Sequence, residues 1–134
     1  MIVHSEKLSI TSEVRNISFV EKMVDDLSSA YKIDSDLYGK MLLAVVEGVN
    51  NAVVHGNKLD KSKTVTVEYS IINDSLYFHI SDQGNGFDYT AVPDPTTPEN
   101  IEKPHGRGIF LMYHLADGIE FKNNGSEVRL MFKL

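Results

Sequence analysis

The segment "SLYFHISDQGNGFD", residues 75–88, leads an apolar strand pattern into a carboxylate and two glycines. Leu76, Phe78 and Ile80 alternate with polar residues, which predicts a strand with one face towards the core. Asp82 continues this alternation, so we expect its side chain to point inward as well. A buried carboxylate costs free energy unless a donor group pairs with it. The carboxylate therefore either bonds the N–H groups of the following turn or binds the amino group of a ligand.

The two glycines after the aspartate, Gly84 and Gly86, are compatible with both interpretations. Glycine adopts positive φ angles at no steric cost, so it suits a turn. Its missing side chain would also let a flat ring approach the backbone closely. This segment alone therefore leaves a turn and a ligand site both open.

Length and composition limit the class of protein. The chain has 134 residues, a net charge of −6 and no cysteine, which suggests one domain over residues 1–134 without disulfides, thiolate metal sites or a cysteine nucleophile. Lys and Arg form no run, so we expect no direct binding to nucleic acid. The apolar runs are too short to span a bilayer and the N-terminus lacks a signal-peptide core. We therefore expect a cytoplasmic protein that does not bind membranes.

Apolar periodicity predicts both helices and strands. Helices are expected over residues 11–31, 34–56 and 106–117, with Ser12 and Asp34 as N-caps of the first two and Gly56 as the stop of the second. Strands are expected over residues 6–10, 64–71, 75–82, 118–122 and 126–134, with hairpin turns at 73–74 and 123–125. The strands are apolar on one face only. The predicted fold is therefore α+β, a two-layer sandwich of a mixed, mostly antiparallel sheet with helices on one face.

The predicted helix over residues 34–56 is apolar enough to be buried, yet Glu47, Asn51 and His55 interrupt it at a spacing of four. Residues four apart in a helix share one face. A carboxylate and an amide one turn apart could hold Mg²⁺ through oxygen atoms while the carboxylate polarises water or a hydroxyl. The alternative is the solvated stripe of an ordinary amphipathic helix. Asn50 lies about 100° round the helix from Asn51, so spacing alone does not say which amide matters.

A second glycine-rich segment, "HGRGIFLM" at residues 105–112, stands directly before a predicted helix. Free N–H groups at a helix N-terminus bind phosphate, although hinge glycines are the alternative. No Gly-Lys-Ser/Thr occurs in the chain and Leu111 holds the position of a third glycine, so neither a Walker A loop nor a complete Rossmann fingerprint is present. Residues 88–105 contain all four prolines. A connection of this length without periodicity predicts a lid.

These features occur in an order that indicates a nucleotide pocket on a helix–sheet sandwich. Asp82 would meet the amino group of the base. Asn51 would hold the metal, and the glycines at 106 and 108 would lie by the phosphates.

Three segments carry a family resemblance. "EGVNNAVVHGN" at 47–57, "DQGNGFD" at 82–88 and "GRGIFLM" at 106–112 resemble the N-box, first glycine box and second glycine box of the GHKL (Bergerat-fold) ATPase superfamily. This superfamily includes histidine-kinase catalytic domains, gyrase and mismatch-repair ATPases. "DPTTPENIEKPHGRGIFLM" at 94–112 is especially similar to its small stand-alone branch, the anti-sigma factor serine kinases of bacterial partner switches. The resemblance covers nearly the whole chain.

The resemblance implies a role for each matching residue. Glu47 matches the residue thought to activate the substrate serine, Asn51 the Mg²⁺ ligand, and Asp82 the residue that binds the adenine amino group. Asn51 is thereby favoured over Asn50. The segment 88–105 matches the ATP lid. The other nucleotide-binding residues implied by the motifs are His55, Gly84, Gly86, Phe87, His105, Gly106, Arg107, Gly108, Ile109 and Ser126, the last offering a hydroxyl where threonine is usual.

The implied function is that of an ATP-dependent serine-protein kinase. It would transfer the γ-phosphate of Mg-ATP to a serine of an anti-sigma-factor antagonist of the STAS type, and would sequester a sigma factor or analogous target. The resemblance also implies a homodimer. Two alternatives are an ATP-binding partner-switch module without phosphoryl transfer and a stand-alone histidine-kinase-type catalytic domain. Family members bind their partner through an arginine on the first helix, whereas Arg15 and Lys22 here do not clearly align with it.

Overall fold

The computed structural model describes the backbone of residues 2–86 and 104–134 and the side chains of residues 5–86 and 108–134. The strands and α-helices, in chain order, are β1 (Ile2–Thr11), α1 (Ile17–Ala30), α2 (Ser35–Asn50), β2 (Thr64–Ile72), β3 (Ser75–Ser81), α3 (Pro104–Leu115), β4 (Gly118–Lys122) and β5 (Glu127–Lys133). Shorter helical turns are η1 (Val14–Asn16), η2 (Asn51–Gly56) and η4 (Asn123–Gly125). Residues 88–103 of the predicted lid lie outside the described residues. Its last two residues, 104 and 105, form the start of α3.

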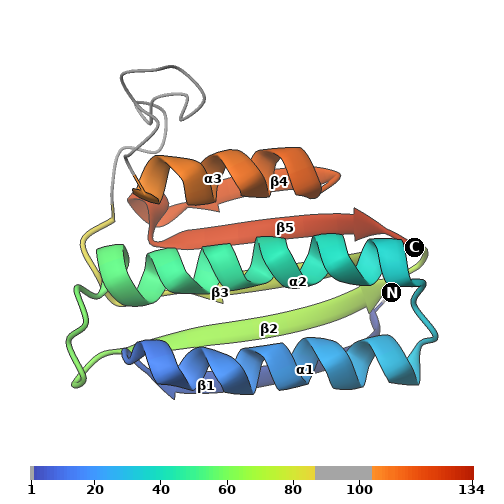
Figure 1. Ribbon diagram of the computed structural model, residues 1–134, viewed down its shortest axis with the longest axis horizontal. Helices are drawn as coiled ribbons and strands as arrows, with labels where there is room; N and C mark the ends of the chain where they lie inside the picture. Colours follow the sequence, from blue (N-terminus) through green and yellow to red (C-terminus); the bar gives the residue numbers. More distant parts are fainter. Residues whose placement is uncertain (1, 87–103) are drawn as a thin grey trace.

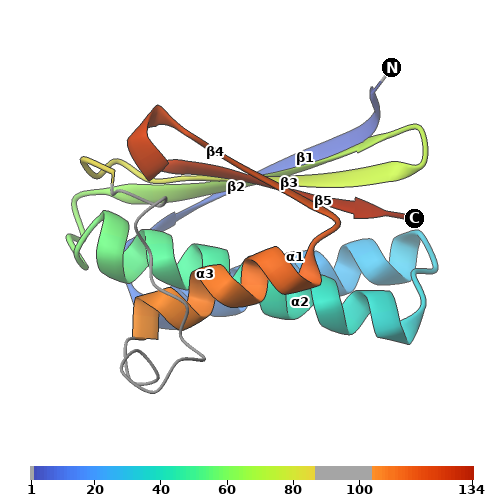
Figure 2. The ribbon, with the colours of Figure 1, turned by 90° about the horizontal axis from the view of Figure 1, so that it is seen from above.

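The strands form one sheet in the order β1-β2-β3-β5-β4, and the helices form a second layer on one of its faces (Figures 1 and 2). All four pairings between these strands are antiparallel. The α+β two-layer sandwich is therefore confirmed. The sequence predicts a mixed, mostly antiparallel sheet, whereas the described strands contain no parallel pair. Hairpins account for two of these pairings, since they join β2 to β3 and β4 to β5.

Side-chain alternation in the strands produces the core. The burial pattern along β2, β3 and β5 alternates residue by residue, as the sequence predicts for strands with one covered face. The inward-facing residues of these strands are Val65, Val67, Tyr69, Ile71, Leu76, Phe78, Ile80, Val128, Leu130 and Phe132. Their apolar side chains pack against the buried faces of α1 and α2, and this packing fixes the helical layer on the sheet.

The starts of the first two helices differ in how they are capped. Asp34 caps α2 as predicted, because its side chain accepts a hydrogen bond from the Leu37 backbone N–H at 3.0 Å. The prediction that Ser12 caps the first helix is wrong. Its hydroxyl donates instead to the Lys63 carbonyl at 2.8 Å, and the residue is only 1% exposed. The 3-10 turn η1 precedes α1, which begins five residues after Ser12.

Both predicted hairpin turns are confirmed. Asn73 has a φ of 55° at the β2–β3 turn, where asparagine tolerates the left-handed region. The β4–β5 connection contains η4, in which Asn123, Asn124 and Gly125 have φ angles of 51°, 58° and 93°. This second turn lies at the same end of the sheet as the residues that follow β3, so it can contribute to a site there.

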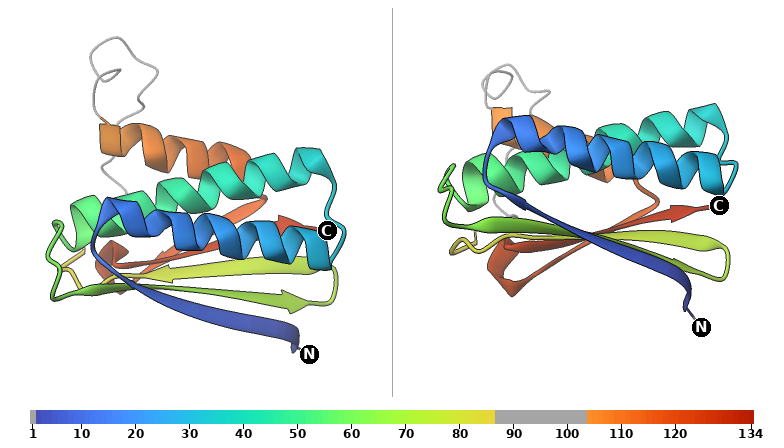
Figure 3. Two further views of the ribbon diagram at one scale, coloured as in Figure 1. Left: turned by 60° about the horizontal axis from the view of Figure 1, so that its bottom comes forward. Right: turned by 90° about the horizontal axis from the view of Figure 1, so that it is seen from below.

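The helical layer has α2 in its middle, between α1 and α3 (Figure 1). The opposite face of the sheet carries no helix in the part of the chain that the structure describes (Figure 3). Among the described helices, none has the length and the apolar stretch that a membrane crossing requires.

Candidate functional site

A pocket lies between the helical layer and one end of the sheet. The residues that line it come from α2, η2, α3 and the strand ends: Gly48, Asn51, Ala52, Gly56, Ile80, Asp82, Met112, Phe121, Gly125, Ser126 and Val128. Four of the predicted site residues are not described in full. Phe87 lies outside the described residues. For His105, Gly106 and Arg107 the structure describes the backbone but not the side chains. The pocket therefore brings together Asn51, Asp82 and Ser126 from the predicted set.

Asp82 points into this pocket, as its place in the strand alternation predicts. Its backbone N–H donates to the Ser126 carbonyl at 2.9 Å, and its Oδ1 accepts from the Gly84 N–H at 2.8 Å. Oδ2 has no hydrogen-bond partner among the described residues. Burial raises the pKa of the Asp82 carboxyl, against the lowering effects of the Gly84 N–H and the Lys63 charge. One carboxylate oxygen therefore bonds the turn, and the other is available to a donor from a ligand.

Three glycines at and near Asp82 are packed too closely against their neighbours to carry a side chain. A Cβ on Gly56 would lie 2.3 Å from Asp82 Oδ2, and a Cβ on Gly84 would lie 2.0 Å from the Gly56 carbonyl oxygen. Gly86 has a φ of 82°, and a Cβ there would lie 2.1 Å from the Asn124 carbonyl oxygen. The glycines after β3 thus allow the close approach of η2 and η4 to the Asp82 backbone.

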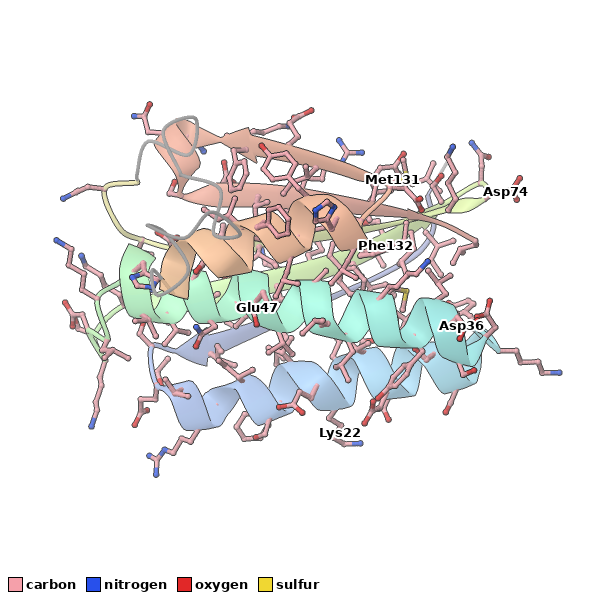
Figure 4. The ribbon with its side chains drawn as sticks, turned by 45° about the horizontal axis from the view of Figure 1, so that its top comes forward. Lys22, Asp36, Glu47, Asp74, Met131 and Phe132 are labelled. Atoms are coloured by element: carbon pink, nitrogen blue, oxygen red, sulfur yellow. The ribbon has the colours of Figure 1, made fainter. Side chains whose placement is uncertain are left out.

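Glu47 and Asn51 converge on α3. In Figure 4 the labelled Glu47 lies on α2 at the side facing α3. A Cβ on Gly108 would lie 3.0 Å from Glu47 Oε2 and 3.3 Å from Asn51 Oδ1. Neither side chain has a hydrogen-bond partner among the described residues, and burial raises the pKa of the Glu47 carboxyl above its ordinary value of 4.5. Two side-chain oxygen groups are therefore directed at the same point near the start of α3.

His55 does not continue the face of Glu47 and Asn51. The helix changes at Asn51 to the π-helix η2, in which the Asn57 N–H bonds the Ala52 carbonyl five residues back at 2.8 Å. A π turn contains more residues than an α turn, so it shifts the direction of the side chains that follow. His55 is exposed and does not line the pocket, whereas Gly56 does.

The second glycine-rich segment lies inside α3 and not in front of it. Because α3 begins at Pro104, Gly106 falls within its first turn, where backbone N–H groups lack intrahelical partners. Gly108 lies further along and makes room for Glu47 and Asn51. Ile109 is 3% exposed and belongs to the core, while Met112 reaches the pocket. The helix expected over residues 106–117 is therefore confirmed with shifted bounds, and of the two glycines only Gly106 lies in its first turn.

Ser126 lies beside Asp82, as expected. Its carbonyl accepts the Asp82 N–H, while its hydroxyl donates to the Asn123 carbonyl at 2.9 Å within the same turn. The hydroxyl thus stabilises η4, which forms one wall of the pocket. A hydroxyl in such a local bond can still accept a hydrogen bond from a ligand.

Several pocket residues were not predicted from the sequence. Gly48, Ala52 and Gly56, three small residues of α2 and η2, all line the pocket. A Cβ on Gly48 would lie 2.7 Å from Ile80 Cδ1, so glycine at this position lets α2 pack closely against β3. The small size of these three residues was the signal available in the sequence. Phe121 and Val128 could not be assigned to the pocket without the strand order.

The chemistry of the pocket fits an adenine nucleotide with Mg²⁺. Asp82, with one carboxylate oxygen that has no partner among the described residues, and Asn51 line the pocket. Glu47 is not a lining residue, but its carboxylate lies with the Asn51 amide beside Gly108 of α3. Within the described residues, no group of three or more His, Cys, Asp or Glu side chains could hold a metal ion. Mg²⁺ commonly binds through one or two protein oxygens together with water and phosphate oxygens. A metal bound through Asn51 would therefore depend on the nucleotide.

Comparison with known proteins assigns the class of this protein. The model of the family described as the histidine kinase-like ATPase domain matches residues 10–132, and the chain belongs to this family. The GHKL resemblance of the sequence is thereby confirmed.

Similarity to individual relatives indicates which branch of the family this chain resembles. The chain is 23% identical to the serine-protein kinase RsbW of Bacillus subtilis (strain 168) over 133 residues, covering 95% of this chain and 83% of the relative. It is 32% identical to the anti-sigma F factor of Clostridium perfringens (strain SM101 / Type A) over 98 residues, covering 68% and 69%. RsbW of Oceanobacillus iheyensis is 24% identical over 133 residues, covering 95% and 75%. The relatives support a place in the anti-sigma-factor kinase branch.

Proposed function

We propose that this protein is an ATP-dependent serine-protein kinase of the anti-sigma-factor type. It transfers the γ-phosphate of Mg-ATP to a serine of a small antagonist protein and sequesters a sigma factor or an analogous regulator. The observation that carries the proposal is the arrangement of three polar groups around one pocket. Asp82 and Asn51 line it, and the Glu47 carboxylate lies with Asn51 beside Gly108 of α3. The family and the names of the relatives support it.

Each group has a distinct chemical role in this proposal. Asp82 Oδ2 accepts a hydrogen bond from the amino group of adenine, because that oxygen has no partner in the described protein. Asn51 Oδ1 offers an oxygen ligand to Mg²⁺, and the bound metal neutralises phosphate charge. The backbone at the start of α3 binds phosphate oxygens.

Glu47 acts as the general base. Its carboxylate takes the proton of the substrate serine as the serine oxygen bonds to the γ-phosphorus and ADP leaves. Its position beside Gly108, near the start of α3, supports a role at the phosphate end of the proposed site. Partial burial raises the pKa of its carboxyl, which strengthens it as a base at neutral pH.

The partners follow from the same proposal. The names of the relatives point to protein phosphorylation and to a sigma factor as target. The antagonist would be a small STAS-type protein, and the kinase would be a cytoplasmic homodimer. In the histidine-kinase-type alternative the phosphate acceptor is a histidine. The acid stability of the phosphorylated product distinguishes this alternative from phosphorylation of a serine.

The test uses radiolabelled ATP, Mg²⁺ and a candidate STAS-type antagonist protein from the same organism. We expect acid-stable label on the antagonist, absent when its acceptor serine is replaced by alanine. ATP binding without label on the antagonist would favour the partner-switch module without transfer. Acid-labile label would favour the histidine-kinase alternative, and the absence of ATP binding would reject the nucleotide site itself.

A further inference from the structure

Asn57 is a buried polar residue that follows the helical segment at the base of the pocket. It is 1% exposed, and its amide group is fully engaged by three segments. Nδ2 donates to Ser12 Oγ at 2.8 Å and to the Thr64 carbonyl at 3.0 Å. Oδ1 accepts the backbone N–H of Gln83 at 2.8 Å. One side chain thus joins the segments before η1, at the start of β2 and after β3.

The bond to Gln83 fixes the backbone immediately after Asp82. The Asp82 N–H is held by the Ser126 carbonyl, and the next N–H, that of Gln83, is held by Asn57. The Gln83 side chain adds a further restraint, since its Oε1 accepts the Thr64 N–H at 2.7 Å. The peptide groups on both sides of the Asp82 Cα are therefore held. Together with the Gly84 N–H, which donates to Oδ1 at 2.8 Å, they restrain the direction of the carboxylate.

Asparagine has the chemistry that this position requires. It needs two donors towards Ser12 and Thr64 and one acceptor towards the Gln83 N–H, all in a buried site. A carboxylate would place an acceptor against the Thr64 carbonyl. An apolar side chain would leave both the Thr64 carbonyl and the Gln83 N–H without a partner.

We propose that Asn57 is a positioning residue for recognition of the purine base. By holding the Gln83 N–H it aims Asp82 Oδ2 so that the pocket accepts a purine with an amino group at position 6 and rejects one with a carbonyl there. This inference rests on the proposed ATP site. Asn57 itself lies behind the pocket wall and does not line it.

The test compares the dissociation constants of Mg-ATP and Mg-ITP, which carry an amino group and a carbonyl at this position. The wild type should prefer ATP by roughly 10- to 100-fold, the range for a hydrogen bond to a charged group. Asn57→Ala should reduce this preference to about threefold or less, chiefly by weakening ATP binding.

Ser12→Ala is the matched control. It removes the hydroxyl that accepts one Asn57 donor and leaves the bond to Gln83 in place. It should lower the melting temperature and keep the ATP preference within about twofold of the wild-type value. If Asn57 had a purely structural role, both variants would lower the melting temperature and keep the ATP preference. An unchanged ATP preference in Asn57→Ala therefore overturns the proposal.

If Asn57→Ala does not fold, hydrogen exchange measured on the wild-type protein tests the proposal instead. The Gln83 amide belongs to an exposed residue outside the strands, so only a bond such as that to Asn57 would slow its exchange. Protection similar to that of the Asp82 amide supports the proposal, and exchange at the rate of a free loop amide overturns it. If the wild type binds ATP and ITP equally, the proposed role of Asp82 fails first.

Discussion

Gly56 and Asp82 are packed so closely that no side chain fits at position 56. A Cβ there would lie 2.3 Å from Oδ2 and 2.5 Å from Cγ of Asp82, distances that real Cβ atoms essentially never show. The end of η2 thus rests directly on the carboxylate after β3. The helix that carries Glu47 and Asn51 is thereby held at a fixed position relative to Asp82.

Gly56→Ala is expected to abolish ATP binding and to destabilise the fold, because the new methyl group must displace Asp82. We expect a loss of about 1–3 kcal/mol in the free energy of unfolding, as for other overpacked sites. Gly39→Ala is the control. Nothing lies within 4 Å of a Cβ on Gly39 in α2, so alanine should stabilise the helix by up to about 1 kcal/mol. Denaturant unfolding and ATP titration measure both effects, and equal behaviour of the variants would contradict the packing argument.

Asp82→Asn is expected to remove the thermal stabilisation that ATP with Mg²⁺ confers. At a ligand concentration of 100 times the dissociation constant, binding stabilises a protein by about 2.7 kcal/mol. An amide in place of the carboxylate loses the charged acceptor for the base. Asp74→Asn is the control, because Asp74 is exposed and lies at the other end of the sheet from the start of α3 (Figure 4). A full ATP shift in Asp82→Asn would exclude Asp82 from base recognition.

Glu47→Gln should separate binding from phosphoryl transfer. The amide keeps the size of the side chain but cannot accept a proton, so the transfer rate should fall by roughly 10²–10⁴-fold. The dissociation constant of ATP should change by about threefold or less, since Glu47 does not contact the base end of the pocket. Single-turnover transfer and calorimetric titration provide the two numbers. A parallel loss of binding would make Glu47 a ligand-holding residue and not a base.

The raised pKa of Glu47 predicts that the free energy of unfolding depends on pH. Burial raises its pKa in the folded state above the ordinary value of 4.5, so the folded protein binds the proton more tightly than the unfolded chain does. The favourable contribution of the protonated group is complete below the ordinary pKa and is lost as the pH rises through the raised pKa. The stability gain of Glu47→Gln over wild type should therefore grow with pH in this window and then level off. Denaturant unfolding of both proteins from about pH 4 to about pH 8 checks this, and a constant difference would contradict it.

The sheet and the direction of Asp82 could be predicted because they follow from local alternation. Val65 to Ile71 and Leu76 to Ile80 alternate with polar residues, and the buried face is the apolar one. Asp34 was predictable as a cap because its partner, the Leu37 N–H, lies three residues away. The nucleotide-binding motifs could also be recognised from the sequence, because each of them is contiguous in the chain.

The remaining features depend on residues that are distant in the sequence. Ser12 bonds Lys63, 51 positions away, so its role as a cap could not be rejected from the segment around it. His55 was placed on the face of Glu47 and Asn51 by an α-helical period that ends where η2 begins. Asn57 was read only as part of a motif, because its partners Ser12 and Gln83 meet through the tertiary fold.

The bond between the Asp82 N–H and the Ser126 carbonyl has a consequence for synthesis of the protein. A nascent chain that has emerged through Asp82 already contains Glu47, Asn51 and the Asp82 carboxylate. It lacks the wall formed by Phe121, Gly125, Ser126 and Val128, which is translated last among the pocket segments. We therefore expect the pocket to be completed only when β5 pairs with β3. Ribosome-bound intermediates that end before Ser126 would carry the chemistry of the site without its shape.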